Sequence, residues 1–191
     1  MTERWRCFVA IPIGDALRAA LSAASAPWQT TLRDTDVRWM DPASWHVTLA
    51  FLGDVDPDHV PVLAEQLPEL VAQHAPVQLV PEGLVAWPRV DETRMVWCRF
   101  RPESAICELH NRVAGSLGTT ERRRFRPHVT LARVRGGRSL ELADQVGAGD
   151  AAAPVLPTTV AHEVTLYRSH LDPAGTTYEA LARAPLGAVP A

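Results

Sequence analysis

The chain has 191 residues, of which 47% are hydrophobic and 21% are charged, and its formal net charge is −3. These values are typical of a folded globular protein and exclude an intrinsically disordered one. No apolar run approaches the ~20 residues that cross a membrane. The three cysteines show no CxxC spacing, which argues against a disulfide framework or a zinc site. We therefore expect a protein of the reducing cytoplasm, with no cofactor, no metal and no obligate protein partner.

The pattern of hydrophobic residues predicts strands and helices in alternation. The predicted strands cover residues 7–11, 37–40, 46–53, 77–80, 84–87, 95–100, 128–132, 160–167 and 176–181. The predicted helices cover residues 15–27, 56–71 and 103–117, with Asp15 as a cap, Pro27 as an end or kink and Gly118 as a stop. Residues 136–159 are rich in Gly, Ala and Pro and indicate a linker with one helical turn near 140–146. This order predicts an α+β fold with two similar halves in one domain, residues 1–191.

Each half contains one copy of the same five-residue motif, His-Val-Thr-Leu-Ala, at residues 46–50 and 128–132. Successive side chains of a strand point to opposite faces, so His and Thr share one face while Val and Leu fill the other. About one sequence of this composition in a hundred would contain two such His-apolar-Ser/Thr-apolar patterns by chance. Two of these strands side by side would present two imidazoles and two hydroxyls, which suits acid–base chemistry on a small anion. Two unrelated strands with solvent-facing histidines are the alternative.

Basic residues gather around the second HVTLA motif. Seven arginines and no acidic residue lie between Arg122 and Arg138. Arginine suits phosphate geometry, so this segment indicates a local anion site in an otherwise acidic chain. The alternative is a charged segment that only keeps a loop solvated.

The two motifs and their flanks resemble the 2H phosphoesterase superfamily, in its RNA 2′,3′-cyclic phosphodiesterase (2′-5′ RNA ligase-like) branch. The similar stretches are Arg38-Trp39 with residues 45–53, residues 125–133, and residues 164–171 with Gly175 and Tyr178. This resemblance covers nearly the whole chain. It implies a bilobal fold in which two pseudo-symmetric lobes line a central groove with antiparallel sheets and carry their helices outside.

The resemblance also implies roles for individual residues. His46 and His128 would be the catalytic acid and base, although the sequence leaves open which is which. Thr48, Thr130 and Arg133 would bind the phosphate. Strict alternation places Arg133 on the wrong face, so a bulge, twist or strand end has to turn it inward.

Contacts to a base or to RNA are the second kind of role that we expect. Phe51 occupies the position of Arg133 in the first copy of the motif and could stack on a base or belong to the core. Further candidates for such contacts are Arg126, Ser169 and Tyr178.

The motifs and the resemblance together predict a metal-independent enzyme that hydrolyses RNA 2′,3′-cyclic phosphate ends. The resemblance implies that the products are 2′-phosphomonoesters. One alternative is a phosphodiesterase for a small cyclic nucleotide or an ADP-ribose cyclic phosphate. The other is a non-catalytic module that binds a nucleotide or RNA.

Overall fold

The computed structural model describes residues 3–32, 36–88, 93–119, 124–138, 155–172 and 175–187. Most of the predicted linker over residues 136–159, including its helical turn near 140–146, lies outside these ranges. The strands are β1 (Trp5–Pro12), β2 (Val37–Trp39), β3 (His46–Val55), β4 (Val77–Leu79), β5 (Pro81–Trp87), β6 (Thr93–Phe100), β7 (His128–Arg138), β8 (Thr159–Ala161), β9 (Glu163–Asp172) and β10 (Gly175–Pro185). The helices are α1 (Asp15–Thr31), α2 (Val60–Val71) and α3 (Ser104–Leu117), with 3₁₀ turns at Pro42–Ser44 and Pro57–His59.

The helices largely follow the sequence pattern, and α1 differs from it at both ends. Gly14, not Asp15, is the N-cap of α1, and the Asp15 carboxylate pairs with Arg18 in the first turn. The helix continues through Pro27 to Thr31, because Trp28 and Leu32 are buried in the core beyond the proline and compensate for its lost hydrogen bond. Helix α3 ends as predicted at Gly118, whose φ of 65° is left-handed.

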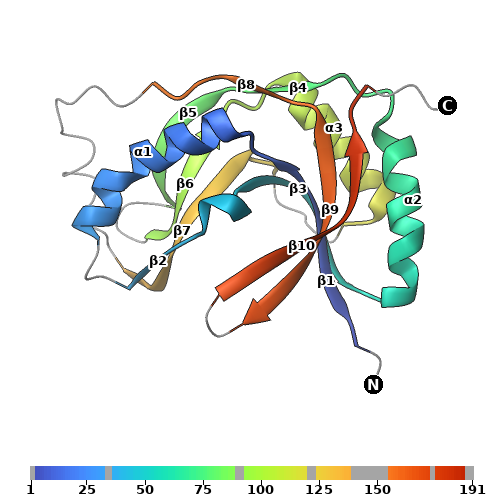
Figure 1. Cartoon of the computed structure of the whole chain (residues 1–191), viewed down its shortest axis with the longest axis horizontal. Coiled ribbons are helices and arrows are strands. Elements are labelled where there is room, and N and C mark those ends of the chain that lie inside the picture. The colour runs from blue at the N-terminus through green and yellow to red at the C-terminus, as the bar shows by residue number, and fades with distance from the viewer. Residues whose placement is uncertain are drawn as a thin grey trace.

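Most strands form one antiparallel sheet in the order β10-β9-β1-β3-β7-β6-β5, and β2 pairs with β7 outside this path. The predicted strand over residues 160–167 is divided in two, since β8 pairs with β4 while β9 pairs with β1 and β10. Figure 1 shows α2 and α3 next to each other on one side of the molecule, α1 on the other, and the β9–β10 hairpin extending from the body. The α+β fold class with antiparallel pairing is confirmed.

The two halves repeat one strand–helix–strand arrangement. In the first half β1 leads through α1 to β3, and in the second half β6 leads through α3 to β7. β3 and β7 then meet at the centre of the sheet. One hydrophobic cluster is shared by both halves and includes the buried residues Val9, Leu21, Val47, Leu109, Val129 and Leu166.

Candidate active site

The two HVTLA motifs lie side by side at the centre of the sheet. Val47 of β3 pairs with Val129 of β7 in antiparallel orientation. Extending this register by one residue each way places His46 opposite Thr130 and His128 opposite Thr48. Both valines are fully buried, so alternation directs the histidines and threonines to the other face of the sheet. The structure thus brings the four predicted polar side chains together.

Each motif contains a β-bulge, and both bulges lie at the fourth residue of the motif. In β3, Val9 pairs with Ala50 and Ala10 with Thr48, which leaves Leu49 as the extra residue. In β7, Val96 pairs with Ala132 and Trp97 with Thr130, which leaves Leu131 as the extra residue. Both leucines are buried in the core. An extra residue reverses the alternation of all residues that follow it.

The bulge in β7 brings Arg133 to the face of the histidines. Arg133 pairs with Met95 of β6, Thr130 pairs with Trp97, and His128 pairs with Arg99. These three β6 residues are spaced two apart and therefore share one face. Because directly paired residues share a face, Arg133, Thr130 and His128 point to the same side. The corresponding bulge in β3 places Phe51 opposite Phe8, on the face of His46, where its side chain is 43% exposed.

Each imidazole makes the same kind of hydrogen bond, from Nδ1 to a backbone carbonyl two residues earlier in the chain. His46 Nδ1 lies 2.7 Å from the carbonyl oxygen of Ser44, and His128 Nδ1 lies 2.7 Å from that of Arg126. A carbonyl can only accept, so Nδ1 carries the proton in each ring and donates it. The neutral ring therefore keeps an unprotonated Nε2, which can take a proton from water or, once charged, return one.

Burial favours the neutral form of both histidines. It lowers the pKa of His46 to about 4, against the opposing effect of the Ser44 carbonyl; the charges of His128 and Arg133 lower it further. Burial also lowers the pKa of His128, again opposed by a carbonyl, that of Arg126, and assisted by the charge of Arg133. A bound phosphate anion would act in the opposite direction and raise the pKa of a nearby imidazole.

The imidazole of His128 lies at one end of a stack of aromatic rings. Its ring stacks on Trp97 with centroids 3.6 Å apart, and Trp97 stacks on Trp87 at 4.3 Å. The guanidinium of Arg126 then lies 4.9 Å from the Trp87 ring. Trp97 is buried and Trp87 is half-buried. The sequence does not reveal this stack, because local patterning cannot show which strand will lie beside a motif.

His46 has aromatic neighbours on three other strands, β1, β9 and β10. The centroid of Phe8 lies 4.9 Å from that of His46, and the Tyr178 ring meets the imidazole edge-on at 5.1 Å. Tyr167 lies slightly farther away, at 6.0 Å. Tyr178 thus lies close to the candidate catalytic residue His46, as do Phe8 and Tyr167, which the sequence did not single out. Ser169 pairs with Tyr178 across the β9–β10 hairpin.

His110 of α3 connects the two motifs from behind the sheet. Its Nδ1 lies 2.7 Å from the carbonyl oxygen of Leu49, the bulge residue of the first motif. Its ring is parallel to that of Phe125 at 4.0 Å, and Phe125 precedes the second motif by three positions. Nothing in the local sequence around His110 indicates this contact.

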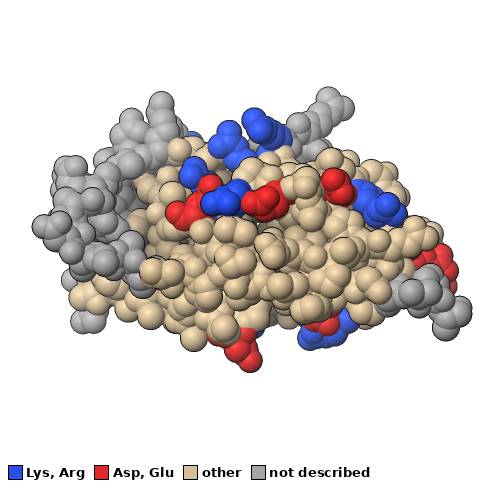
Figure 2. Space-filling model, turned by 90° about the horizontal axis from the view of Figure 1, so that it is seen from above, with Lys and Arg blue, Asp and Glu red and all other residues tan. Residues whose placement is uncertain are grey.

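The rest of the arginine-rich segment is described only in part. Arg122 and Arg123 lie outside the described residues, as do the side chains of Arg135 and Arg138, while Arg124 and Arg126 are exposed. On the face shown in Figure 2, most basic and acidic side chains are interspersed in one band, and a few others lie along the edges. The described part of that face therefore carries no large patch of a single sign.

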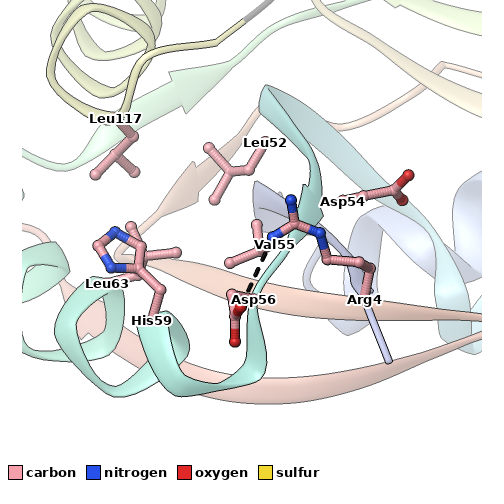
Figure 3. Close-up of a pocket in the computed structure, with 8 residues that line it drawn as sticks. All are labelled: Arg4, Leu52, Asp54, Val55, Asp56, His59, Leu63 and Leu117. Carbon is pink, nitrogen blue, oxygen red and sulfur yellow. Dashed lines mark ion pairs between the residues drawn. The ribbon is translucent and has the colours of Figure 1, made fainter. Parts of the chain in front are cut away.

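A separate pocket of about 300 Å³ lies at the other end of β3. Figure 3 shows Arg4 turned toward Asp56 there, and the two side chains form an ion pair at 3.8 Å. His59, Leu63 and Leu117 line the same pocket. Within the described ranges, no group of three or more His, Cys, Asp or Glu residues is placed to hold a metal ion. No helix in the same ranges has the length and hydrophobicity to span a bilayer.

Comparison with known proteins identifies the family of this chain. Residues 11–97 match the family model "LigT like Phosphoesterase". A protein of Aeropyrum pernix named RNA 2′,3′-cyclic phosphodiesterase is 30% identical over 129 residues, which cover 65% of this chain and 67% of the relative. The chain belongs to the LigT-like phosphoesterase family. The family predicted from the HVTLA motifs is therefore confirmed.

Two further members of the LigT-like family extend the comparison. A Geobacillus stearothermophilus protein with the same name is 31% identical over 98% of this chain, although the chain spans only 59% of that relative's length. The crystal structure of Escherichia coli LigT complexed with 3′-AMP has a TM-score of 0.67 and 25% identity, and the match covers 97% of this chain and 99% of LigT. The LigT-like fold thus extends over both halves of the protein.

Proposed function

We propose that the protein hydrolyses the 2′,3′-cyclic phosphate ends of RNA to 2′-phosphomonoesters. The observation that carries this proposal is the pairing of the two HVTLA motifs around Val47 and Val129. It presents two imidazoles with unprotonated Nε2 atoms, each opposite the hydroxyl of the other motif. The relatives from Aeropyrum and Geobacillus support it, since both are named RNA 2′,3′-cyclic phosphodiesterase.

The reaction needs one proton removed and one delivered. One imidazole takes a proton from water as the water oxygen attacks phosphorus. The other imidazole, charged in the bound complex, donates its proton to the O3′ oxygen as the P–O3′ bond breaks. The phosphate remains on O2′ as a monoester. One histidine must be neutral and the other charged in the bound complex. Folding lowers the pKa of both histidines, and the charge of the bound phosphate raises the pKa of the histidine that it contacts.

Three other side chains stabilise the phosphate oxygens. Thr48 and Thr130 offer hydroxyl donors, one from each motif. Arg133 adds a positive charge on the same face, as its pairing with Met95 indicates. Such donors act most strongly on the charge that develops in the transition state. Phe51 and Tyr178 border this group and are proposed to contact the sugar or base, with Arg126 and Ser169 farther out.

A product assay tests the proposal. The purified protein is incubated with an RNA oligonucleotide that ends in a 2′,3′-cyclic phosphate and, separately, with nucleoside 2′,3′-cyclic monophosphates, and the products are read by ³¹P NMR. We expect the 2′-phosphomonoester from the oligonucleotide. The His59→Ala variant, whose histidine lines the separate pocket, should behave as wild type. Turnover of mononucleotides alone would support the small-molecule alternative, and binding without any turnover would contradict an enzymatic role.

We also propose a cytoplasmic location and substrates that are RNA ends or nucleotides. The free cysteines support a reducing compartment. Cys7 and Cys98 are buried, and burial raises the pKa of both thiols, that of Cys98 to about 12. Thiols of this kind are unreactive and are not placed to form disulfides.

A further inference from the structure

Three polar residues form a row on the outer part of the site face. Arg6 of β1 pairs with Ser169 of β9, and Ser169 pairs with Tyr178 of β10. Residues paired directly across antiparallel strands share a face. Arg6 lies two residues from Phe8, and β1 pairs with β9 without a register shift between them. Phe8 contacts His46, so the row faces the same side as the catalytic histidines.

The row lies next to the proposed phosphate site. Two residues along a strand correspond to ~6.6 Å. Arg6 therefore lies about this distance along β1 from Phe8, which contacts His46. Burial raises the pKa of the Tyr178 hydroxyl, while the charges of Arg133 and Arg6 lower it. The hydroxyl of Tyr178 is thus within electrostatic reach of both arginines and links the reaction centre to Arg6.

Arg6 differs from the neighbouring arginines in having no carboxylate partner. Arg4 pairs with Asp56, Arg168 with Glu3, and Arg183 with Glu163. Asp54 lies opposite Arg6 in the register of β1 and β3, yet no acidic group among the described residues is within 4.0 Å of the exposed Arg6 guanidinium. The hydroxyls of Ser169 and Tyr178 likewise make no hydrogen bond to another residue that the structure describes. All three groups are therefore available to an outside anion.

We propose that Arg6, Ser169 and Tyr178 form a second phosphate subsite, which binds the 5′-phosphate of the nucleotide that carries the cyclic phosphate. In an RNA end this group is the last phosphodiester, and one ribose separates it from the reacting phosphorus. Arginine supplies charge and paired donors, and the two hydroxyls supply neutral donors. The inference rests on the proposed function and deepens it, because it explains how the site distinguishes an RNA end from a nucleoside cyclic phosphate with a free 5′-hydroxyl.

The test compares two substrates that differ only at the 5′ position. kcat/KM is measured for a nucleoside 2′,3′-cyclic phosphate with a 5′-hydroxyl and for the same compound with a 5′-phosphate. We expect the wild type to prefer the 5′-phosphorylated compound by about tenfold or more, as for a charge-assisted contact. The preference should decrease at high salt. It should fall toward one in Arg6→Gln and decrease in part in Ser169→Ala and Tyr178→Phe.

The matched control is Arg4→Gln, which removes the same charge two residues away. Arg4 faces Asp56 in the separate pocket (Figure 3), so this variant should keep the wild-type preference. An active wild type without a preference, or a folded Arg6→Gln that retains it, would overturn the subsite.

A binding measurement separates this inference from the proposed reaction. Calorimetry compares a nucleoside 2′-phosphate with the corresponding 2′,5′-bisphosphate, and neither compound needs to react. Tighter binding of the bisphosphate that is lost in Arg6→Gln supports the subsite even if no cyclic phosphate is turned over. Equal binding of the two compounds contradicts the subsite and leaves the proposed reaction to its own assay.

Discussion

Val47 and Val129 are paired across β3 and β7, and each is the second residue of its own HVTLA motif. An antiparallel pair of identical residues in identical motifs creates a local two-fold relationship. Each histidine consequently lies opposite the threonine of the other motif. The proposed chemistry needs two imidazoles with opposite proton tasks, and this symmetry supplies both from one repeated sequence.

Removal of the threonine hydroxyls should slow the reaction without unfolding the protein. We expect Thr48→Val and Thr130→Val each to lower kcat by about 10²–10³, the usual effect of losing a donor to developing charge, with a smaller change in KM. Steady-state kinetics on a nucleoside 2′,3′-cyclic phosphate measures both constants. Thr159→Val is the matched control, because the Thr159 hydroxyl is buried in β8 without a hydrogen-bond partner among the described residues. If the three variants have the same rate, the threonines have no role in stabilising the phosphate.

The position of the candidate catalytic groups, more than their identity, depends on features that local sequence cannot reveal. The alternating pattern correctly predicts both motif strands, and the location of Arg133 five residues after His128 already required a bulge or a similar irregularity. The stacking of Trp97 on His128 and the packing of Phe8 on His46 depend on which strands become neighbours. Such pairings join residues far apart in the chain, and only the folded sheet determines them.

His110 is predicted to position the first motif through its hydrogen bond to the Leu49 carbonyl. Asn places an amide donor close to the position of Nδ1, whereas Gln places it farther out. We expect His110→Gln to lower kcat by on the order of 10- to 100-fold, as for a small displacement of reacting groups, and His110→Asn to restore most of it. Circular dichroism checks that both variants are folded. Equal activity of Asn and Gln variants would show that this hydrogen bond does not position the site.

Activity should not depend on a metal ion. Two imidazoles can supply both proton transfers, and no suitable ligand cluster exists among the residues that the structure describes. Prolonged treatment with EDTA followed by gel filtration should leave kcat/KM unchanged. A loss of activity that added Mg²⁺ or Zn²⁺ restores would contradict the proposed mechanism.

The stability of the protein should decrease in mild acid because of His46. An unfolded histidine binds a proton below its ordinary pKa of 6.5, whereas folded His46 binds one only near pH 4. Proton binding therefore stabilises the unfolded state relative to the folded state as the pH falls from 6.5 to 4. This effect lowers the free energy of unfolding by up to about 3 kcal/mol. Urea unfolding at pH 7.5 and 4.5 measures it.

His46→Gln provides the comparison for this pH dependence. Gln does not titrate, so the variant should lose less stability than the wild type between pH 7.5 and 4.5. The pKa of His128 is lowered in the same direction, which leaves part of the dependence in place. An identical pH dependence in the variant and the wild type would show that the pKa of His46 is not lowered by folding.

The most direct test of the acid–base pair is the pH dependence of kcat/KM for the wild type, His46→Ala and His128→Ala. Two imidazoles with opposite tasks predict a bell-shaped profile for the wild type, with apparent pKa values that belong to the coupled pair. Each single variant should lose one limb of the bell and fall in rate by on the order of 10²–10⁴. Intact folding of each variant is checked by its unfolding transition. A folded variant that retains both limbs at nearly the full rate would remove that histidine from the mechanism and contradict the account.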